Sequence, residues 1–260
     1  MQRTTVGTVE LIALIDTIEA YPATSIYPAA DLARYGQHLD ADGAIALNFA
    51  CFLVRDGTVT LLVDTGYGPE HGGKLLEELA EARVERTAID LVLFTHLHGD
   101  HTGWNFDRQT GDPLFPNARY LVPKADWDHY GANPNDSFDR DVRPLQQLAR
   151  IDLIEGERNL SEALTAVPTP GHTPGHTSVA ITSGGERGFI LGDVVISAID
   201  AEDPTIESVF DSDNAVAKET RVRTIEQLIA DGSLVGASHL PAPGLGRFVR
   251  TTARQYWQSM

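Results

Sequence analysis

The feature that most constrains this chain is a dense run of potential metal ligands at the end of an apolar strand. The strand pattern at residues 91–94 leads directly into His96, His98, Asp100 and His101. Alternate residues of an extended segment point to the same side, so the imidazoles of His96 and His98 can face one ion. Asp100 and His101 are adjacent and face different ways, which suits a second, neighbouring ion. The alternative is an exposed polar loop with capping residues, but this density of histidine favours metal chemistry at a strand end.

Three more potential ligands also follow strand-like segments. His172 lies in the Gly/Pro-rich turn 170–176 after the apolar segment 163–167, where the backbone can pass close to an ion. Asp193 follows the apolar segment 188–191, and its two carboxylate oxygens can each bind one of two cations. His239 follows the apolar residues 234–235. From the residues alone, a turn cap at Asp193 and a structural role for His239 stay open.

The alternation of strand-like and helix-like segments predicts an α/β chain. Strands are expected at 45–54, 58–63, 91–95, 120–122, 163–167, 179–182 and 188–191. Helices are expected at 73–82, 125–130, 142–149 and 214–230, the last with Asp213 as its N-cap and Gly232 at its end. Because strands come in hairpin-like groups before the helices, we expect mixed sheets packed face to face with helices outside. No linker rich in Pro, Gly or Ser divides the chain, so residues 1–260 are expected to form a single domain.

Two strand ends resemble each other across the chain. The segment 62–66 continues from Leu62 and Val63 into Asp64, and the segment 190–193 ends in Gly192 and Asp193. This likeness is compatible with two related halves.

Composition and charge exclude several classes of protein. With 42% hydrophobic and 22% charged residues the chain is of ordinary globular composition, and no apolar run approaches the roughly 18 residues needed to span a bilayer. The formal net charge of −17 opposes binding to nucleic acid and weakly favours neutral or cationic substrates. Glu10 and Asp16 bracket the short apolar run 11–15, so we expect no export signal and a cytoplasmic location. The single Cys51 is expected to be a small buried hydrophobe.

The spacing of the potential ligands resembles the metallo-β-lactamase-fold hydrolase superfamily, whose hallmark is an H-x-H-x-D-H loop with a later His, a bridging Asp and a final His. The resemblance covers roughly residues 45–245 and implies a four-layer αββα sandwich with the site along the sheet edges. It implies that one divalent ion is held by His96, His98 and His172, the other by Asp100, His101 and His239, and that Asp193 bridges them. Asp64 would then support a ligand imidazole, and His176 would be a packing residue beside the ligands.

The reaction implied by this resemblance is hydrolysis by a hydroxide that bridges two divalent ions, and the imidazole and carboxylate ligands favour zinc. Asp100 would be the catalytic residue that relays a proton to the leaving group. The flavodiiron relatives carry Glu where this chain has His98, which favours hydrolysis over redox chemistry. A non-catalytic metal-binding protein on the same scaffold is the contrasting class, and the intact ligand set argues against it.

Within the superfamily the sequence looks most like the lactonase and methyl-parathion-hydrolase branch, through segments 101–105, 115–120 and 238–246. Quorum-quenching acyl-homoserine lactonases carry a Tyr three residues after the bridging Asp, where this chain has Ile196. We therefore expect a neutral lactone or ester as the small-molecule substrate, with a phosphotriester as the alternative. No nucleic-acid or membrane partner is expected, and a homodimer stays open. Aromatic candidates for the pocket wall are Tyr21, Tyr27, Trp104, Phe106, Phe138 and Phe210.

Overall fold

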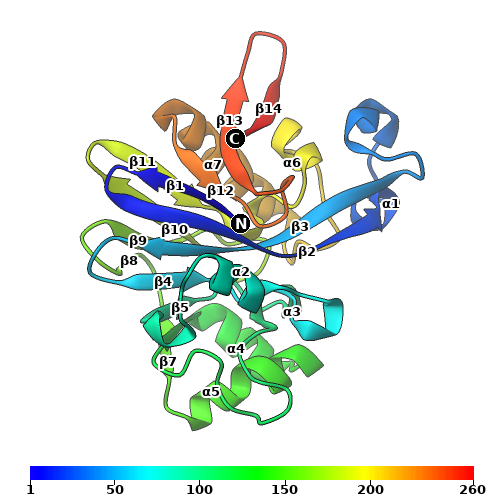
Figure 1. Ribbon diagram of the computed structural model, residues 1–260. Coiled ribbons are helices and arrows are strands. Elements are labelled where there is room, and N and C mark those ends of the chain that lie inside the picture. The colour runs from blue at the N-terminus through cyan, green and yellow to red at the C-terminus, as the bar shows by residue number, and fades with distance from the viewer.

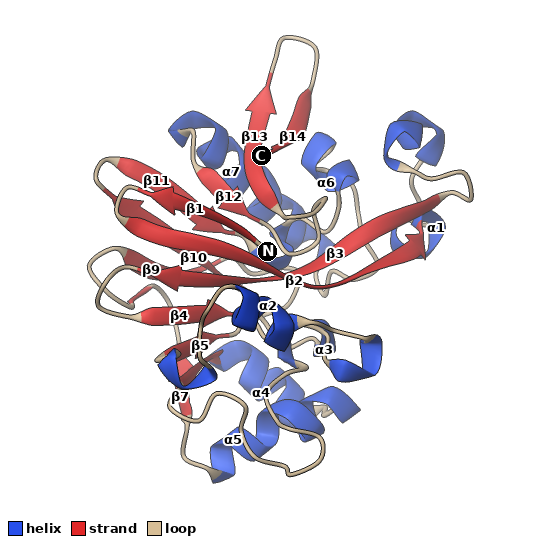
Figure 2. Ribbon diagram, in the orientation of Figure 1, coloured by secondary structure: helices blue, strands red, loops and turns tan.

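Two seven-stranded sheets form the centre of the molecule, which a computed structural model describes for all 260 residues (Figure 1). The first sheet follows chain order: β1 (Gln2–Val6), β2 (Val9–Pro22), β3 (Ala44–Arg55), β4 (Thr60–Val63), β5 (Leu91–Leu93), β6 (Arg119–Pro123) and β7 (Ile151–Ile154). The second runs β14 (Gln255–Ser259), β13 (Leu245–Arg250), β12 (Leu234–Gly236), β11 (Glu186–Ile190), β10 (Thr177–Ser183), β9 (Leu164–Pro168) and β8 (Arg158–Asn159). Helices cover the outer faces of both sheets (Figure 2), so the expected four-layer αββα sandwich is confirmed.

The helices divide between the two sheets. On the first sheet lie α2 (Leu75–Glu81), α4 (Lys124–Ala132) and α5 (Arg143–Gln147), and on the second lie α6 (Ala198–Glu202) and α7 (Asn214–Asp231). Two short helices, α1 (Ala23–Ile26) and α3 (Gly99–Thr102), complete the α-helical set. Tighter 3₁₀ turns occur at Leu32–His38, Pro69–His71, Arg86–Ala88 and Gly192–Val194, and a π-helical turn at Phe138–Val142. None of the helices combines the length and apolar composition that crossing a membrane requires.

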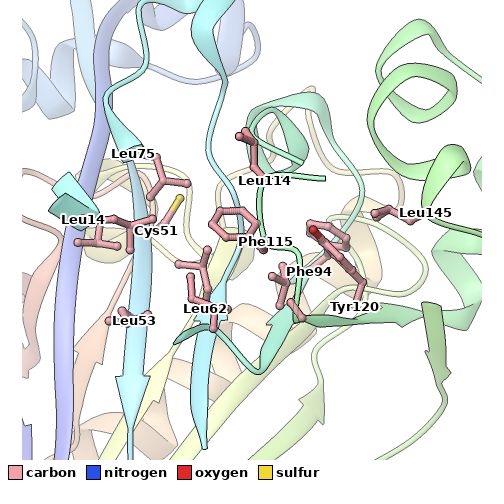
Figure 3. Packing of buried hydrophobic residues seen from close by; sticks show 14 of the residues in the cluster. Leu14, Cys51, Leu53, Leu62, Leu75, Phe94, Leu114, Phe115, Tyr120 and Leu145 are labelled. Atoms are coloured by element: carbon pink, nitrogen blue, oxygen red, sulfur yellow. The ribbon is translucent and has the colours of Figure 1, made fainter. Parts of the chain in front are cut away.

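Three apolar cores separate the layers because the central strands are buried on both faces. Along β2, Leu11 and Ala13 pack between the sheets, whereas Ile12 and Leu14 pack toward the helices. The continuous apolar run at 11–15 is therefore part of a strand with two buried faces. Cys51 is fully buried, as expected, and lies among apolar side chains of β2 and α2 (Figure 3).

The sequence signals agree best with the structure at α7 and worst at the sheet edges. The Asp213 side chain accepts hydrogen bonds from the backbone N–H groups of Ala215 and Val216, and Gly232 ends the helix at a φ of +62°. The expected strands are present as β3–β6 and β9–β11. The sequence did not predict β1, β2, β7, β8, β13 and β14. Of these, β1, β7, β8 and β14 are edge strands, where polar residues are tolerated and the apolar pattern is weak.

Parallel strand pairs decide where the polar residues collect. In the first sheet β4, β5, β6 and β7 are parallel, and in the second β11 is parallel to β12. The carboxyl ends of parallel strands meet at one edge of a sheet. Asp64 and His96 follow β4 and β5, and Asp193 and His239 follow β11 and β12. The fold thus brings residues that are far apart in sequence to a common edge.

Candidate metal centre

Three imidazoles converge to form the first of two clusters. The Nδ1 atom of His98 lies 3.0 Å from Nε2 of His96 and 3.0 Å from Nε2 of His172. Burial lowers the pKa of His98 to about 4 and holds the pKa of His96 well below its usual range, so these rings are neutral. Three facing nitrogens of neutral rings cannot all be satisfied by one another's protons, whereas a cation between them satisfies all three lone pairs.

Asp64 supports two ligand imidazoles, that of His96 in the first cluster and that of His101 in a second cluster described below. Thr95 donates its backbone N–H to Asp64 Oδ1 (2.7 Å) and its hydroxyl to Oδ2 (2.8 Å), so His96 Nδ1 donates to the Thr95 hydroxyl (3.0 Å). His101 Nδ1 donates to Asp64 Oδ2 (2.8 Å). These contacts leave Nε2 of both rings as the free, site-facing nitrogen. Asp64 therefore lies where the sequence predicted a supporting carboxylate.

Asn48 on β3 and Asp211 in the segment before α7 orient two further imidazoles, those of His239 and His172. His239 Nδ1 donates to the backbone carbonyl of Asn48 at 2.8 Å, which links the last strands to β3. His172 Nδ1 lies 3.2 Å from Oδ1 of the buried Asp211. In both rings Nε2 is turned toward the clusters.

The second cluster consists of Asp100, His101, Asp193 and His239, whose candidate ligand atoms all lie within 4.8 Å of one another. Although burial opposes a charge on His239, the carboxylates of Asp193 and Asp100 raise its pKa to about 10. Burial would raise the pKa of Asp193, but His239 and His101 more than offset it and hold that pKa well below its usual range. His101 Nε2 and Asp193 Oδ1 are buried without a hydrogen-bond partner. This cluster therefore attracts positive charge and leaves donor atoms free to bind it.

Asp193 belongs to the second cluster and also lies close to the first. Its Oδ2 is 3.0 Å from His239 Nε2 and 3.5 Å from His172 Nε2, and its Oδ1 is 3.3 Å from His101 Nε2. Its backbone N–H donates to His176 Nε2 at 2.9 Å. Burial lowers the pKa of His176 to about 3, so the ring is neutral and can accept this bond. His176 thus fixes the backbone of Asp193 rather than facing the cluster.

The donor set suits divalent cations. The seven side chains brought together are those that the sequence predicted: His96, His98, Asp100, His101, His172, Asp193 and His239. Five imidazoles and two carboxylates are the ligand types preferred by zinc and by several other first-row ions. Together with the unpartnered buried atoms of His101 and Asp193, this composition fits two neighbouring metal ions.

A cavity of about 360 Å³ opens above the clusters. Five of the predicted ligands form its floor, and its walls are formed by Tyr21, Leu47, Phe49, Tyr67, Ile196 and Phe210. Neither Lys nor Arg lines it. The walls therefore offer apolar surface and two neutral hydroxyls to a substrate.

Only two of the six aromatic candidates from the sequence line this cavity, namely Tyr21 and Phe210. The other four pack elsewhere: Tyr27, Phe106 and Phe138 are buried in apolar clusters, and Trp104 donates to Asp16 at 2.7 Å. Sequence reasoning missed Leu47, Phe49 and Tyr67. Leu47 and Phe49 could have been found from their spacing, because residues two apart on a strand share a face.

Tyr67 is held rigidly at the cavity wall. Its ring stacks on His71 at a centroid distance of 3.5 Å and on Phe49 at 4.9 Å. Its backbone N–H donates to the buried Asp16 at 2.7 Å. Phe49 in turn meets the His239 ring edge-on at 4.8 Å. The wall and a predicted ligand are therefore in direct contact.

Sequence reasoning also missed a carboxylate that joins two ligand loops. The fully buried Asp126 accepts hydrogen bonds from the backbone N–H of Leu97 (3.3 Å), the hydroxyl of Thr173 (2.8 Å) and the backbone N–H of Gly175 (2.6 Å). A side chain at Gly175 would collide with Asp126. No local pattern marks Asp126, because its partners come from other parts of the chain.

Comparison with known proteins agrees with this architecture. The family model described as the metallo-beta-lactamase superfamily matches residues 49–239. N-acyl homoserine lactonase of Bacillus cereus is 24% identical over 200 residues, which are 67% of this chain and 75% of that protein. The solved structure of AidC, a dizinc quorum-quenching lactonase in complex with a product, is 26% identical with a TM-score of 0.86, covering 100% of this chain and 97% of AidC.

Several curated relatives are much longer than the matched region. The lactamase-like protein vrtG of Penicillium aethiopicum is 30% identical over 146 residues, which are 56% of this chain but 39% of that protein. Across vrtG and three further relatives, the chain spans 38–60% of the relative's length.

Proposed function

The chain belongs to the metallo-beta-lactamase superfamily, and from this premise we propose that it is a metal-dependent hydrolase acting on a neutral lactone or ester. The observation that carries the proposal is the pair of adjoining clusters beneath a cavity that no Lys or Arg lines. We propose further that residues 1–260 act as one domain, because the clusters draw side chains from both sheets.

In this proposal two divalent ions occupy the two clusters. His96, His98 and His172 would hold one ion, Asp100, His101 and His239 the other, and Asp193 both. Two such ions, which we propose to be zinc as in the dizinc structural relative, would lower the pKa of a bound water molecule and polarise the substrate oxygen.

Asp100 is the residue proposed to handle the proton. It lines the cavity and is partly exposed, while its Oδ2 lies 3.4 Å from the Nε2 atoms of His101 and His239. The carboxylate thus faces the second cluster and the substrate space together. From this position it can take a proton from the attacking water and deliver it to the leaving oxygen.

The walls of the cavity favour a neutral substrate with an apolar arm. Leu47, Phe49 and Phe210 offer apolar contact, and no Lys or Arg lines the cavity to pair with a carboxylate or phosphate. Tyr21 already donates its hydroxyl proton to Glu19 at 2.7 Å, so Tyr67 is the wall hydroxyl with a proton to offer to a substrate carbonyl. Ile196 has no such group. The net charge of −17 also disfavours anionic substrates.

The decisive measurement is kcat/KM for an acyl-homoserine lactone, a simple aryl ester and a phosphotriester on one preparation, loaded with zinc and then with manganese. We expect carbonyl substrates to be hydrolysed faster than the phosphotriester, with activity lost to chelator and restored by metal. If the phosphotriester exceeded both by more than about tenfold, roughly 1.4 kcal/mol in transition-state binding, the phosphotriesterase alternative would be correct. No turnover of any substrate by the metal-loaded protein would favour a binding protein.

Metal analysis tests the dinuclear part separately. After mild reloading, the protein is expected to approach two equivalents of metal per chain, because Asp100 and His101 face away from the first cluster. Saturation at one equivalent, unchanged by Asp100→Ala, would rule out a second ion.

A further inference from the structure

A fully buried arginine lies close to the clusters although it belongs to neither. Arg221, on α7, is 0% exposed. Its Nε donates to the carbonyl of Val194 (2.8 Å), its Nη1 to the carbonyl of Ile206 (2.8 Å), and its Nη2 to Asp211 Oδ2 (2.7 Å). Three acceptors from separate parts of the chain thus meet one planar guanidinium. One of them, Val194, directly follows the predicted bridging residue Asp193.

Asp211 connects Arg221 to His172, a member of the first cluster. One carboxylate oxygen binds Arg221, while the other lies 3.2 Å from His172 Nδ1. The neighbouring backbone supports the same contact, because Ser212 N–H donates to the carbonyl of His172 (2.9 Å) and Asp213 N–H to that of Gly171 (3.0 Å). The loop that bears His172 is therefore paired with the segment 203–213 through side-chain and backbone bonds.

A second buried carboxylate helps to keep the guanidinium charged. Asp200 is 0% exposed, and together with Asp211 it holds the pKa of Arg221 above its usual value against the opposing effect of burial. Asp200 accepts the backbone N–H of Ile196 at 2.8 Å and the hydroxyl of Tyr27. The arginine is thus charged, and its three hydrogen bonds hold it in place beside Asp211.

The segment 203–213 also forms part of the substrate cavity. Phe210 directly precedes Asp211 and lines the cavity. We propose that Asp211 and Arg221 are positioning residues for the ligand His172, and that through the segment 203–213 they link metal binding to the position of the Phe210 wall. The inference deepens the proposed function, yet its first part concerns metal binding alone and needs no substrate.

Asp211→Asn and Arg221→Met test the positioning role, with Asp141→Asn as a matched control. Asp141 is also 0% exposed and paired with an arginine, Arg108, at 2.7 Å, but contacts none of the seven ligands. Zinc affinity is measured by competition with a chromophoric chelator, ligand geometry by the visible spectrum of the cobalt-loaded protein, and folding by the melting temperature without metal.

We expect Asp211→Asn and Arg221→Met to weaken zinc binding by about 10- to 100-fold, as is typical for partners of ligand imidazoles, and to shift the cobalt bands. Asp141→Asn should lower the melting temperature yet leave zinc affinity within about threefold of the parent protein, because no hydrogen bond or ion pair joins its side chain to a ligand. Unchanged affinity and cobalt spectrum in Asp211→Asn, alongside a lower melting temperature, would show a purely structural role. If Arg221→Met does not fold, Asp211→Asn alone decides.

Phe210→Trp tests the link to the cavity wall. Addition of zinc should shift the emission of this tryptophan relative to the parent protein, and combination with Asp211→Asn should diminish the shift. If the emission did not change on addition of zinc, the link between metal binding and the position of Phe210 would be wrong, while the positioning role would stand. Because neither readout uses a substrate, absence of lactone or ester hydrolysis would contradict the proposed function without deciding this inference.

Discussion

The two halves of the molecule use the same local arrangement of strands to deliver different parts of the site. In the first sheet, β3 and β4 are antiparallel and β4 is parallel to β5; in the second, β10 and β11 are antiparallel and β11 is parallel to β12. Asp64 and Asp193 follow the corresponding strands β4 and β11, and His96 and His239 follow β5 and β12. The weak likeness between segments 62–66 and 190–193 thus coincides with equivalent positions in two sheets.

The halves differ in how their ligands are supported. The first half places four predicted ligands within six residues, and a single carboxylate, Asp64, contacts both His101 and Thr95. The second half places His172, Asp193 and His239 on three separate loops, each with a partner of its own. A compact ligand loop therefore needs few supports, whereas dispersed ligands need one support each.

The most severe change should be the loss of the residue that the halves share. In the proposed two-ion site, Asp193→Ala would remove the carboxylate that lies close to both ions, so we expect zinc affinity to fall by more than the roughly 100-fold typical of outer partners, and activity with it. Asp56→Ala, in a turn away from the clusters, is the control. Full metal content and near-normal turnover in Asp193→Ala would show that the two clusters are joined by another group.

Asp64→Asn and Asp211→Asn compare the supports of the two halves directly. Each change keeps the side-chain shape and removes the charge beside a ligand imidazole. We expect about a 10- to 100-fold loss of zinc affinity for both, with the larger loss for Asp64→Asn, because Asp64 also binds Thr95. Chelator competition on both variants measures the order, and a larger loss for Asp211→Asn would reverse our view of which half depends more on its support.

The smallest effect concerns the cavity walls, whose hydroxyls come only from the first half. Tyr67→Phe removes one neutral hydrogen bond of about 0.5–1.5 kcal/mol, so kcat/KM for a lactone should fall by no more than about tenfold, with metal content unchanged. Tyr35→Phe serves as the control, since its hydroxyl donates to Asp203 at 2.7 Å and does not line the cavity. Equal kinetics for Tyr67→Phe and the parent protein would remove Tyr67 from substrate binding.

Much of this arrangement is predictable from the sequence because it depends on short-range signals. The density of histidine marks the loop after β5 as a candidate metal site, and the Gly and Pro content marks the turn around His172. Asp193 and His239 are recognisable as strand-end residues, and their ligand roles came from the family resemblance. The hairpin-like strand groups predict mixed sheets packed face to face with helices outside, and the four-layer αββα arrangement came from the family resemblance.

The remainder depends on contacts that no local pattern records. Asp126, Asp211 and Arg221 look like ordinary surface charges in sequence, and only the tertiary fold buries them against ligand loops. The residues of the cavity walls were missed for a related reason. The sequence pattern of a strand is the same whether an aromatic side chain faces a core or a cavity. The edge strands were not predicted because the sequence of a strand that pairs on one side only shows little apolar periodicity.

The long β2–β3 hairpin has a consequence for how the substrate range of such a protein can change during evolution. It contributes Tyr21, Leu47 and Phe49 to the cavity, while the backbone carbonyl of Asn48 and the ring of Phe49 contact His239. Replacement of Tyr21 and Leu47 can therefore alter which acyl groups fit while both contacts with the ligand are retained. New substrates become accessible by mutations that leave the catalytic apparatus untouched, and the hairpin is the natural place to begin a library for altered selectivity.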